Sequence, residues 1–383
     1  MKCSKVMQLG IIAMLFFIIS CKHNPITEPD EETYDPRNIS RTETQSVGPV
    51  IALSPDGTVY VIWMDGGESE NEPFHIYFKY KSPHNEGWSE SEIISDTATN
   101  SWEPGVVVDP FGNLHVVWRE EDPDVEHAKI YYRMRSSSGE WSDIEVISCE
   151  VALQPRIAVD SSGTVHVVWN ESRMRYRNRT PDGTWSAIEE GPIYIENPSI
   201  AVDSNGGVHL VTEQGAGDDI VYLYRSPTGE WSEPVNVSKS PDWYSWVPSV
   251  TVGVDGTVWV NWVEVGQRAM YYAFKRKDGD WTLPDSVPDI PGYPGVNKVL
   301  YDKFGNLHYI WEEIRDGACD IYHKVFSRDG DWGDEENLSG TPGYSLCPDF
   351  AIGSGGIYVV WSEREEEEGD YNREIYFEVV PLP

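Results

Sequence analysis

Histidine side chains recur at one place in this 383-residue chain, and histidine can act as a general base near neutral pH. Each stands three residues before the end of a short apolar phrase, as in Val-His-Val-Val-Trp169. The members of this set are His115, His166, His209 and His308. Aromatic residues hold the same place in three similar phrases, namely Tyr60, Trp259 and Tyr358. Because the position recurs in every phrase, we interpret the histidines as buried spacers rather than catalytic bases.

An acidic side chain follows most of the same phrases, two residues past their last position. This set comprises Asp65, Glu120, Glu171, Glu264, Glu313 and Glu363. Arg173 and Arg315 stand two residues beyond two of these acids, where each could form an ion pair. The recurrence favours a structural acceptor in a loop. The alternative is a mixed site of acid and arginine, and the spacing does not choose which pair would perform acid–base chemistry.

The phrases that carry these residues repeat seven times, and this repetition determines the expected fold. Six end in Trp63, Trp118, Trp169, Trp262, Trp311 and Trp361, and a seventh ends in Thr212. Copies about 50 residues apart indicate an array of small β-units. Each unit is predicted to hold four short strands joined by turns rich in Gly, Asp and Pro, and in the third unit a loop over Asn170–Arg173 joins the second and third strands. Such units repeated radially predict an all-β, seven-bladed β-propeller.

The last unit lacks a fourth strand of its own. The other units finish that strand with sequences such as Ile-Ile-Ser95, and Asn-Ile-Ser40 supplies a matching ending near the N-terminus. We therefore expect residues 34–42 to complete blade 7 and close the ring, which removes exposed sheet edges. The propeller domain would then comprise residues 34–383.

The segment before this strand predicts export. Lys2 and Lys5 precede an apolar run too short to span a bilayer, so residues 1–20 are interpreted as a signal peptide. Ile18-Ile-Ser-Cys21 resembles the lipobox of bacterial lipoproteins, and this resemblance implies cleavage before Cys21 and lipidation of Cys21. An ordinary signal peptide is the alternative. Residues 21–33 would form a tether to the bacterial cell envelope, at the outer membrane or cell surface.

Composition and motifs exclude several classes of function. The 64 acidic residues against 29 Lys and Arg give a formal net charge of −35, which repels nucleic acid and anionic lipid. Membrane contact is therefore expected through the lipid on Cys21 alone. No phosphate loop, nucleophile elbow or metal-binding motif is present in the sequence, so neither cofactor nor metal is expected. Cys319 and Cys347 fall in neighbouring loops on one face of the expected propeller, and export permits a disulfide between them.

Periodicity assigns most of the 16 tryptophans to packing. Beside those that end the second strand, six start the fourth strand: Trp88, Trp141, Trp185, Trp231, Trp281 and Trp332. Three others break the pattern in loops between blades: Trp102, Trp243 and Trp246. Comparable loops hold Tyr194, Tyr293 and Tyr344. Rings around the mouth of a propeller would suit stacking on sugar faces, and capping of the seams between blades is an equal alternative.

Charged residues break the pattern directly after the first-strand proline position. Arg156, Lys298 and Asp349 stand there, where other units have small or apolar residues. Because the first strand lines the central channel of a propeller, these ions are expected near its mouth. The predicted ligand site combines them with Trp102, Trp246, Tyr344 and Arg173.

The repeats resemble the sialidase-like, Asp-box-type propellers of bacterial surface proteins. The resemblance covers residues 47–380 and rests on Val-Val-Trp-x-Glu, on third strands such as Ile130-Tyr-Tyr132 and on the turn Ser327-Arg-Asp-Gly-Asp-Trp332. Sialidases, however, have six blades and a longer Asp-box, and their Arg-Ile-Pro motif is absent because Pro155-Arg-Ile157 has another order. The resemblance therefore implies the fold and not sialidase activity.

Three functions are compatible with this sequence. The first is a monomeric envelope lipoprotein whose propeller binds a glycan or a partner protein without catalysis. The second is a glycan-active enzyme, either a hydrolase or a polysaccharide lyase, in which Arg156, Lys298 and a nearby tyrosine would act on a uronate. The third is a scaffold in an envelope complex.

Overall fold

The protein is described by a computed structural model that covers residues 35–42, 44–66, 73–96, 99–121, 128–214, 219–240, 244–364 and 372–382. Within these ranges every regular element is a β-strand, and all strands belong to one compact unit, Arg37–Pro383. Among the residues described, no helix is long and apolar enough to cross a membrane. The all-β prediction is confirmed.

Five successive repeat units each fold into an antiparallel sheet of four strands in chain order. Their strands are β1 (Gln45–Leu53), β2 (Val59–Gly66), β3 (Phe74–Lys81), β4 (Glu92–Ile93); β5 (Asn100–Val108), β6 (Leu114–Glu121), β7 (Lys129–Arg135), β8 (Glu145–Val146); β9 (Leu153–Val159), β10 (Val165–Glu171), β11 (Arg173–Arg179), β12 (Glu189–Glu190); β13 (Glu196–Val202), β14 (Val208–Gln214), β15 (Asp219–Arg225), β16 (Val235–Asn236); and β17 (Ser245–Val252), β18 (Val258–Glu264), β19 (Ala269–Lys275), β20 (Asp285–Ser286).

Units 6 and 7 share one seven-stranded sheet. Its strands are β21 (Tyr293–Tyr301), β22 (Leu307–Arg315), β23 (Ala318–Phe326), β24 (Glu336–Asn337), β25 (Tyr344–Gly353), β26 (Gly356–Arg364) and β27 (Glu374–Val380). A parallel bridge between Cys319 and Tyr344 joins β23 of unit 6 to β25 of unit 7.

Unit 3 shows why these sequences form sheets. A tight turn closed by Gly163, at φ 88°, connects β9 to β10, and glycine takes this left-handed conformation without a steric penalty. All residues of β10 are buried, because Trp169 packs toward unit 2 while Val168 packs toward unit 4. Pro155 is tolerated because β9 is the edge strand of its sheet, so the N–H that proline lacks is not needed for a hydrogen bond to another strand.

Every first strand carries a β-bulge just before this proline position. In six units the residue at the bulge has a positive φ: Gly48, Glu103, Gln154, Asn197, Val247 and Cys347. Such a φ is uncommon outside glycine, so the surrounding structure must hold these residues in place. The bulge takes their backbone amides out of the ladder and directs them to the neighbouring unit.

The predicted packing role of the twelve periodic tryptophans is confirmed. The six that end the second strand are fully buried, at 0% exposure. The fourth-strand tryptophans lie in the seams, where Trp185, for example, meets Tyr132 of the preceding unit edge-on at 5.0 Å between ring centroids. The equivalent pairs are Trp88–Phe377, Trp141–Phe78, Trp231–Tyr176, Trp281–Tyr222 and Trp332–Tyr272.

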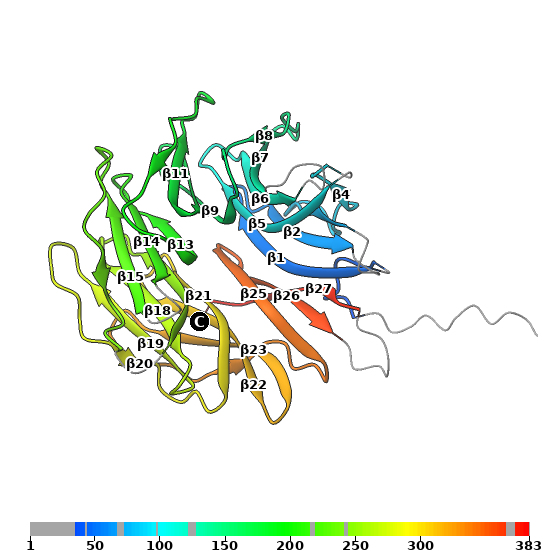
Figure 1. The fold of residues 1–383 in the computed structure, drawn as a ribbon. Helices are drawn as coiled ribbons and strands as arrows, with labels where there is room; N and C mark the ends of the chain where they lie inside the picture. The colour runs from blue at the N-terminus through cyan, green and yellow to red at the C-terminus, as the bar shows by residue number, and fades with distance from the viewer. Residues whose placement is uncertain are drawn as a thin grey trace, which may run out of the picture. The chain divides into compact units, whose positions relative to one another are not determined.

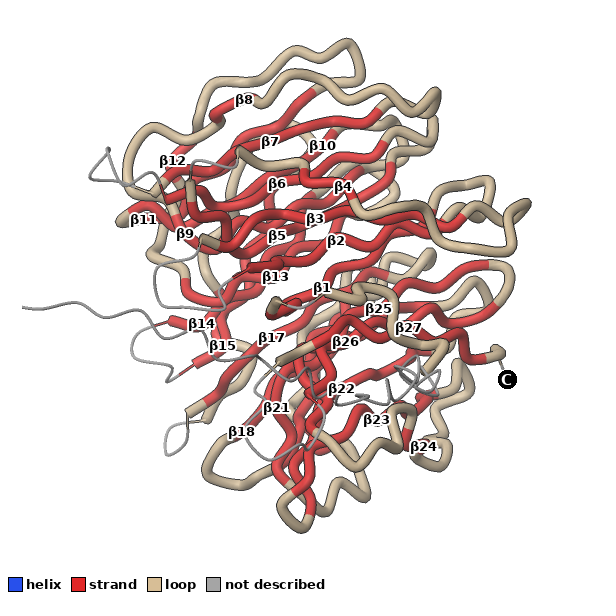
Figure 2. Tube along the Cα trace, turned by 90° about the vertical axis from the view of Figure 1, so that its right-hand side faces the viewer, coloured by secondary structure: helices blue, strands red, loops and turns tan. Residues whose placement is uncertain are grey.

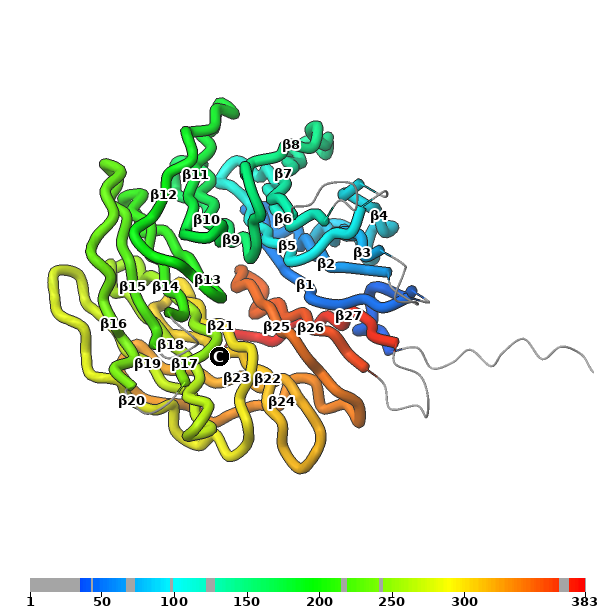
Figure 3. The backbone as a smooth tube through the Cα atoms, viewed as in Figure 1, coloured from blue at the N-terminus to red at the C-terminus, as the bar shows by residue number. Residues whose placement is uncertain are grey.

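The first strands follow one another in a closed series. β1, β5, β9, β13, β17, β21 and β25 contact each other in this order, and β25 contacts β1 (Figures 1 and 3). Residues 37–40 pair along β27, where Ile39 N donates to Ile375 O at 2.7 Å and Ile375 N donates to Ser40 Oγ at 2.8 Å. The serines at the ends of four other units, such as Ser95, receive the same bond.

The strands run between two faces of the compact unit (Figure 2). We call the side where second strands pass to third strands, and where one unit connects to the next, the loop face. We call the side with the tight turns between first and second strands the turn face. The recurring acids stand at the loop-face end of their strands, and the recurring histidines stand near the turn face.

Candidate functional site

The recurring histidines lie in buried relays between an aspartate and an aromatic residue. In unit 2, His115 Nδ1 is 2.7 Å from the Tyr132 hydroxyl, and Nε2 is 3.3 Å from Asp109. Units 3 and 4 repeat the His–Tyr contact at 2.8 Å, whereas unit 6 places His323 beside His308 at 3.1 Å. The four histidines of the set are at most 6% exposed. Their interpretation as buried spacers is confirmed, because each relay orients an aromatic side chain of the sheet and three of them hold a seam tyrosine.

The same relays set the charge of the turn aspartates. Although burial of the Asp109 carboxylate opposes it, hydrogen bonds from His115 and from the turn bring the pKa of Asp109 down to about 2. Burial raises the pKa of Tyr132 and so keeps its hydroxyl protonated. An Asp–His–Tyr set can serve catalysis only where substrate reaches it, and His115 and Tyr132 are 3% and 0% exposed.

The recurring carboxylates accept hydrogen bonds that tie each second strand to the loop before its unit. Asp65 Oδ2 accepts from the Trp63 indole at 3.1 Å and from Ser46 Oγ at 2.5 Å. Equivalent indole bonds reach Glu120, Glu264, Glu313 and Glu363. These acids are almost completely buried. Glu171 accepts instead from Glu150 N and Arg175, and Glu264 Oε2 has no partner among the described residues. The structural interpretation is confirmed for the set.

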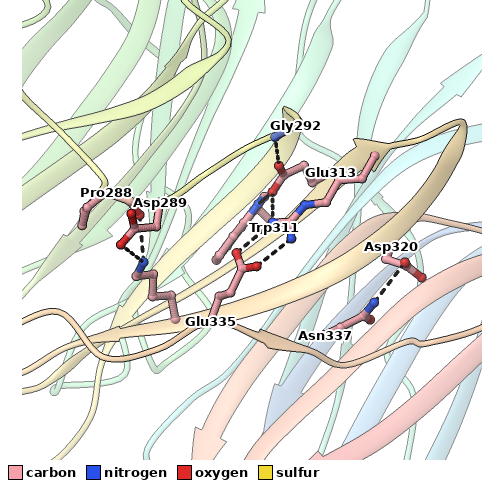
Figure 4. A network of polar contacts seen from close by, with 10 residues as sticks. Pro288, Asp289, Gly292, Trp311, Glu313, Asp320, Glu335 and Asn337 are labelled. Carbon is pink, nitrogen blue, oxygen red and sulfur yellow. Dashed lines mark hydrogen bonds and ion pairs between the residues drawn. The ribbon is translucent and has the colours of Figure 1, made fainter.

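Of the two arginines expected to pair with a recurring acid, only Arg315 does so. Figure 4 shows Glu313 in a network with Trp311 and Glu335, in which Arg315 Nη2 lies 2.7 Å from Glu313 and Nη1 lies 2.6 Å from Glu335.

In unit 3, Arg173 does not pair with Glu171; the partner is Arg175, at 2.9 Å. The prediction was wrong because β10 and β11 continue to Glu171 and Arg173, so Ser172 alone turns the chain and the expected loop is absent. The Arg173 side chain is 56% exposed.

The three ions that break the first-strand pattern occupy one layer of the first strands. Lys298 Nζ lies 2.5 Å from Asp349 Oδ1, and Asp349 Oδ2 accepts from Ile51 N of unit 1 at 2.9 Å. Serines at the same position do likewise, since Ser199 Oγ accepts from Val250 N at 3.2 Å. In units 4 to 7 this position therefore bonds one first strand to the next around the ring.

Arg156 is the exception in this layer. Its guanidinium donates one hydrogen bond, from Nη1 to the Pro155 carbonyl at 2.9 Å, and forms no ion pair with a described carboxylate. Burial lowers the pKa of Arg156, while the nearby charges of Glu103 and Asp349 favour its protonated form. The side chain is half-buried, and no described protein group accepts a hydrogen bond from its remaining N–H groups.

A chain of polar side chains at the bulges was not predicted from the sequence. Gln154 N donates to Glu103 Oε2 at 2.8 Å, Asn197 N donates to Gln154 Oε1 at 3.1 Å, and Asn197 Nδ2 donates to Glu213 Oε1 at 3.0 Å. Val247 N ends the chain on Glu213 at 2.8 Å. In the sequence, the available signal for this polar chain was a polar residue directly before the recurring proline.

Two carboxylates near this layer have a raised pKa. Burial raises the pKa of Glu213 and of Glu312, which both stand directly after the Trp position of the second strand. Glu312 accepts a hydrogen bond from Cys347 N at 2.6 Å. These acids depart from the repeat, where other units have residues such as Met64 and Ser362.

The predicted aromatic residues lie in different environments. Trp102 packs in the seam to unit 1, with its ring centroid 4.8 Å from that of a phenylalanine of β3. For Trp102, the alternative of capping a seam between units is therefore confirmed. Trp246, at the start of β17, is 45% exposed. Tyr344 is half-buried beneath Arg364, whose guanidinium lies 4.2 Å from the ring centroid. The structure thus brings the three ions into one layer but does not gather these rings around them. Trp243 lies outside the described residues.

The disulfide expected between Cys319 and Cys347 is not formed in the structure. Both thiols are free, as is Cys149. Cys319 is paired with Tyr344, three residues before Cys347, which is an offset of roughly 10 Å along the strand and too long for a disulfide. The lipidation prediction for Cys21 falls outside the described residues.

A depression of about 530 Å³ lies at the turn face, away from the predicted residues. It is lined by first-strand ends and turns of units 1, 2, 3 and 7, including Leu53, Asp56, Val108, Asp160, Ser354 and Tyr358. None of the predicted ligand-site residues contributes to it. Across the described parts of the chain, no group of three His, Cys, Asp or Glu side chains is arranged to hold a metal ion.

Comparisons with known proteins place the fold. Residues 31–240 match the model of a family described as BNR repeat-containing family member. A protein of unknown function from Dyadobacter fermentans is similar over 89% of this chain and 96% of its own, with 13% identity and a TM-score of 0.59. The polysaccharide lyase Uly1 aligns over 88% and 90%, with 11% identity and a TM-score of 0.59. The NanB sialidase of Streptococcus pneumoniae aligns over 90% and 69%, with 11% identity and a TM-score of 0.51. No curated protein matches the sequence.

Proposed function

Since this chain belongs to the BNR repeat-containing family and its repeats are of the sialidase-like type, we propose that it binds a glycan at its central channel without cleaving it. The observation that carries the proposal is the Arg156 guanidinium on the first strand of unit 3, which has one protein hydrogen bond and no ion pair with a described carboxylate. Arginine presents a planar fork of N–H groups that matches a carboxylate. We propose that Arg156 binds an acidic or hydroxyl oxygen of the sugar.

The surroundings of Arg156 support ligand binding over a purely structural role. Structural ions in the same layer are paired, as Lys298 is with Asp349. A buried cation without an ion pair costs stability, and a bound anion offsets this cost. The glycans on which polysaccharide lyases and sialidases act are the ligand class suggested by the similar structures.

The absence of catalysis is supported by the roles of the recurring residues. Three of the recurring histidines are held in relays with tyrosine, and His308 contacts His323. The histidines are at most 6% exposed and the recurring acids at most 3%, so a ligand in the channel has little access to them.

One observation favours the alternative of a glycan-active enzyme. Burial raises the pKa of Glu312, and a raised carboxyl pKa is a property that a general acid requires. In this alternative Glu312 would donate a proton while Arg156 neutralises the sugar carboxylate. Release of reducing or unsaturated sugar ends from any bound glycan would favour the enzyme.

We further propose that the seven units are seven blades of one propeller. The closed series of first strands supports this count, with the bridge between Cys319 and Tyr344 joining two blades into one sheet. The pairing of residues 37–40 with β27 supports closure by the N-terminal strand over 34–42.

We propose that the mature protein is a lipoprotein of the cell envelope, anchored through Cys21. The lipobox-like Ile18-Ile-Ser-Cys21 supports this location. Mass spectrometry of the native N-terminus should find acyl chains on Cys21, and Cys21→Ser should move the protein from the membrane to the soluble fraction. An unmodified Cys21 would contradict the proposal.

A glycan array probed with the full-length protein in detergent micelles tests the binding function. We expect binding to glycans that carry a carboxylate, and Arg156→Gln should weaken it about tenfold or more, since a charge-assisted hydrogen bond is worth about 1.5–3 kcal/mol. Arg328→Gln is the matched control, because the Arg328 side chain is 68% exposed in the turn between β23 and β24 of unit 6. Equal binding by both variants, or no binding by the parent protein, would refute the proposal.

A further inference from the structure

Four tyrosines occupy one equivalent position in successive units. Each stands four residues before the first-strand proline position, at the loop face: Tyr194, Tyr244, Tyr293 and Tyr344 in units 4 to 7. Units 1 to 3 have Gln45, Asn100 and Val151 there instead. The first strands that follow, β13, β17, β21 and β25, are consecutive neighbours. The tyrosines therefore form a continuous arc over one half of the ring, which we call the tyrosine arc.

These rings are exposed although their neighbours are buried. Tyr194, Tyr244 and Tyr293 are 43%, 57% and 47% exposed. Ser245, directly after Tyr244, is 0% exposed, so the strand alternation turns the tyrosine outward. A position that is not needed for the core and yet holds tyrosine in four successive units is unlike the seam tryptophans, which pack against the preceding unit.

Two of the tyrosines lie beneath arginines. The Arg268 guanidinium is 4.0 Å from the Tyr293 centroid, and the Arg364 guanidinium is 4.2 Å from the Tyr344 centroid. Within the described residues, neither arginine makes an ion pair or a side-chain hydrogen bond, so no described group occupies their N–H edges beside the rings. Arg268 comes from unit 5 and covers a ring of unit 6, which makes the surface continuous across that seam.

We propose that the tyrosine arc is a run of subsites for a linear glycan chain, and this inference rests on the proposed glycan binding. An aromatic ring offers a flat apolar face to the C–H groups of a sugar, while an arginine edge donates to its hydroxyl or carboxylate oxygens. Equivalent groups repeated along an arc fit a ligand that is built of repeated units. The ligand class is thus a polysaccharide chain that passes over units 4 to 7, with one of its sugars at Arg156.

Chain length is the variable that tests this inference. Linear oligogalacturonates and cello-oligosaccharides of two, four and six sugars serve as probes, titrated calorimetrically into the full-length protein in micelles. For the series that binds, affinity should rise at least tenfold from two to six sugars, as successive rings become engaged. An affinity independent of length, or no binding by either series, overturns the inference.

Variants separate the arc from the channel site. The double variant Tyr244→Ala/Tyr293→Ala should abolish the gain with length and leave disaccharide affinity unchanged, whereas Tyr293→Phe should bind as the parent does. Phe111→Ala is the control on the turn face, where Phe111 is 61% exposed. If the double variant keeps the full length dependence, the arc is refuted while the channel proposal stands. If Arg156→Gln abolishes all binding and the affinity of the parent protein does not depend on chain length, the channel proposal stands and the arc is refuted.

Discussion

Replacing His323 by tyrosine should make the protein less sensitive to acid. His323 holds the position that Tyr132, Tyr176 and Tyr222 hold in other units, and its ring is stacked at 5.3 Å on that of His308. Burial, together with the neighbouring His308, lowers the pKa of His323 from 6.5 to about 4. The folded protein therefore resists the protonation that the unfolded chain accepts.

The sign and size of the effect follow from proton linkage. Because the folded-state pKa is depressed, the stability contributed by a neutral His323 is complete above pH 6.5 and is lost as the pH falls toward 4. At about 1.4 kcal/mol for each pH step, lowering the pH from 7.5 to 4.5 should cost about 2–3 kcal/mol through this residue. His323→Tyr removes this cost and offers His308 the hydroxyl that accompanies histidine elsewhere, at 2.7–2.8 Å.

Urea unfolding of parent and variant at pH 7.5 and pH 4.5 measures this difference. Titrating groups that do not contact residue 323 act equally in both proteins, so they cancel in the comparison. The loss of unfolding free energy on acidification should be about 2–3 kcal/mol smaller in His323→Tyr than in the parent. His84→Tyr, at an exposed loop position, is the control and should behave as the parent does. Identical acid sensitivity of parent and His323→Tyr would refute the argument.

Three further variants test packing and closure. Arg175→Ala should lower the unfolding free energy by about 2–3 kcal/mol because it strands a buried carboxylate, whereas Arg173→Ala should change it by less than about 0.5 kcal/mol; denaturant unfolding compares them. Gly356→Ala should cost more than about 2 kcal/mol, since its Cβ would lie 2.3 Å from a backbone carbonyl, while Gly330→Ala, with no atom within 4 Å, should pay only about 1 kcal/mol for its left-handed φ; equal melting temperatures would contradict this. Deleting residues 35–42 should lower the melting temperature and promote aggregation by uncovering β27, as light scattering during thermal unfolding would show.

Local periodicity was enough to predict the strands, the turns and the packing tryptophans. A residue such as Trp185 recurs in every complete unit, and recurrence implies a role that every unit needs. The same reasoning correctly removed His115 from the list of catalytic bases, since a catalytic residue has no reason to appear in several units. The ions of the channel layer, such as Lys298, stood out because they break a period.

Contacts between units were beyond the reach of this reasoning. Trp102 and Trp246 occupy the same register position, yet one packs in a seam and the other is exposed, because the partner belongs to the preceding unit. The register of Tyr244, four residues before Pro248, places it at the same position as the other loop tyrosines. Arg175 rather than Arg173 pairs with Glu171, because Ser172 alone connects β10 to β11.

The sequence by itself determined the all-β repeat, the number of units and the distinction between periodic and aperiodic residues, because these depend only on alternation and spacing along the chain. The tertiary structure decided which side chains meet across the seams, since neighbouring units bring together residues about 50 positions apart. The bulges, the polar chain from Glu103 to Glu213, the unpaired Arg156 and the tyrosine arc all arise at those seams and around the channel. Their positions follow from how the units pack against one another, which no single unit encodes.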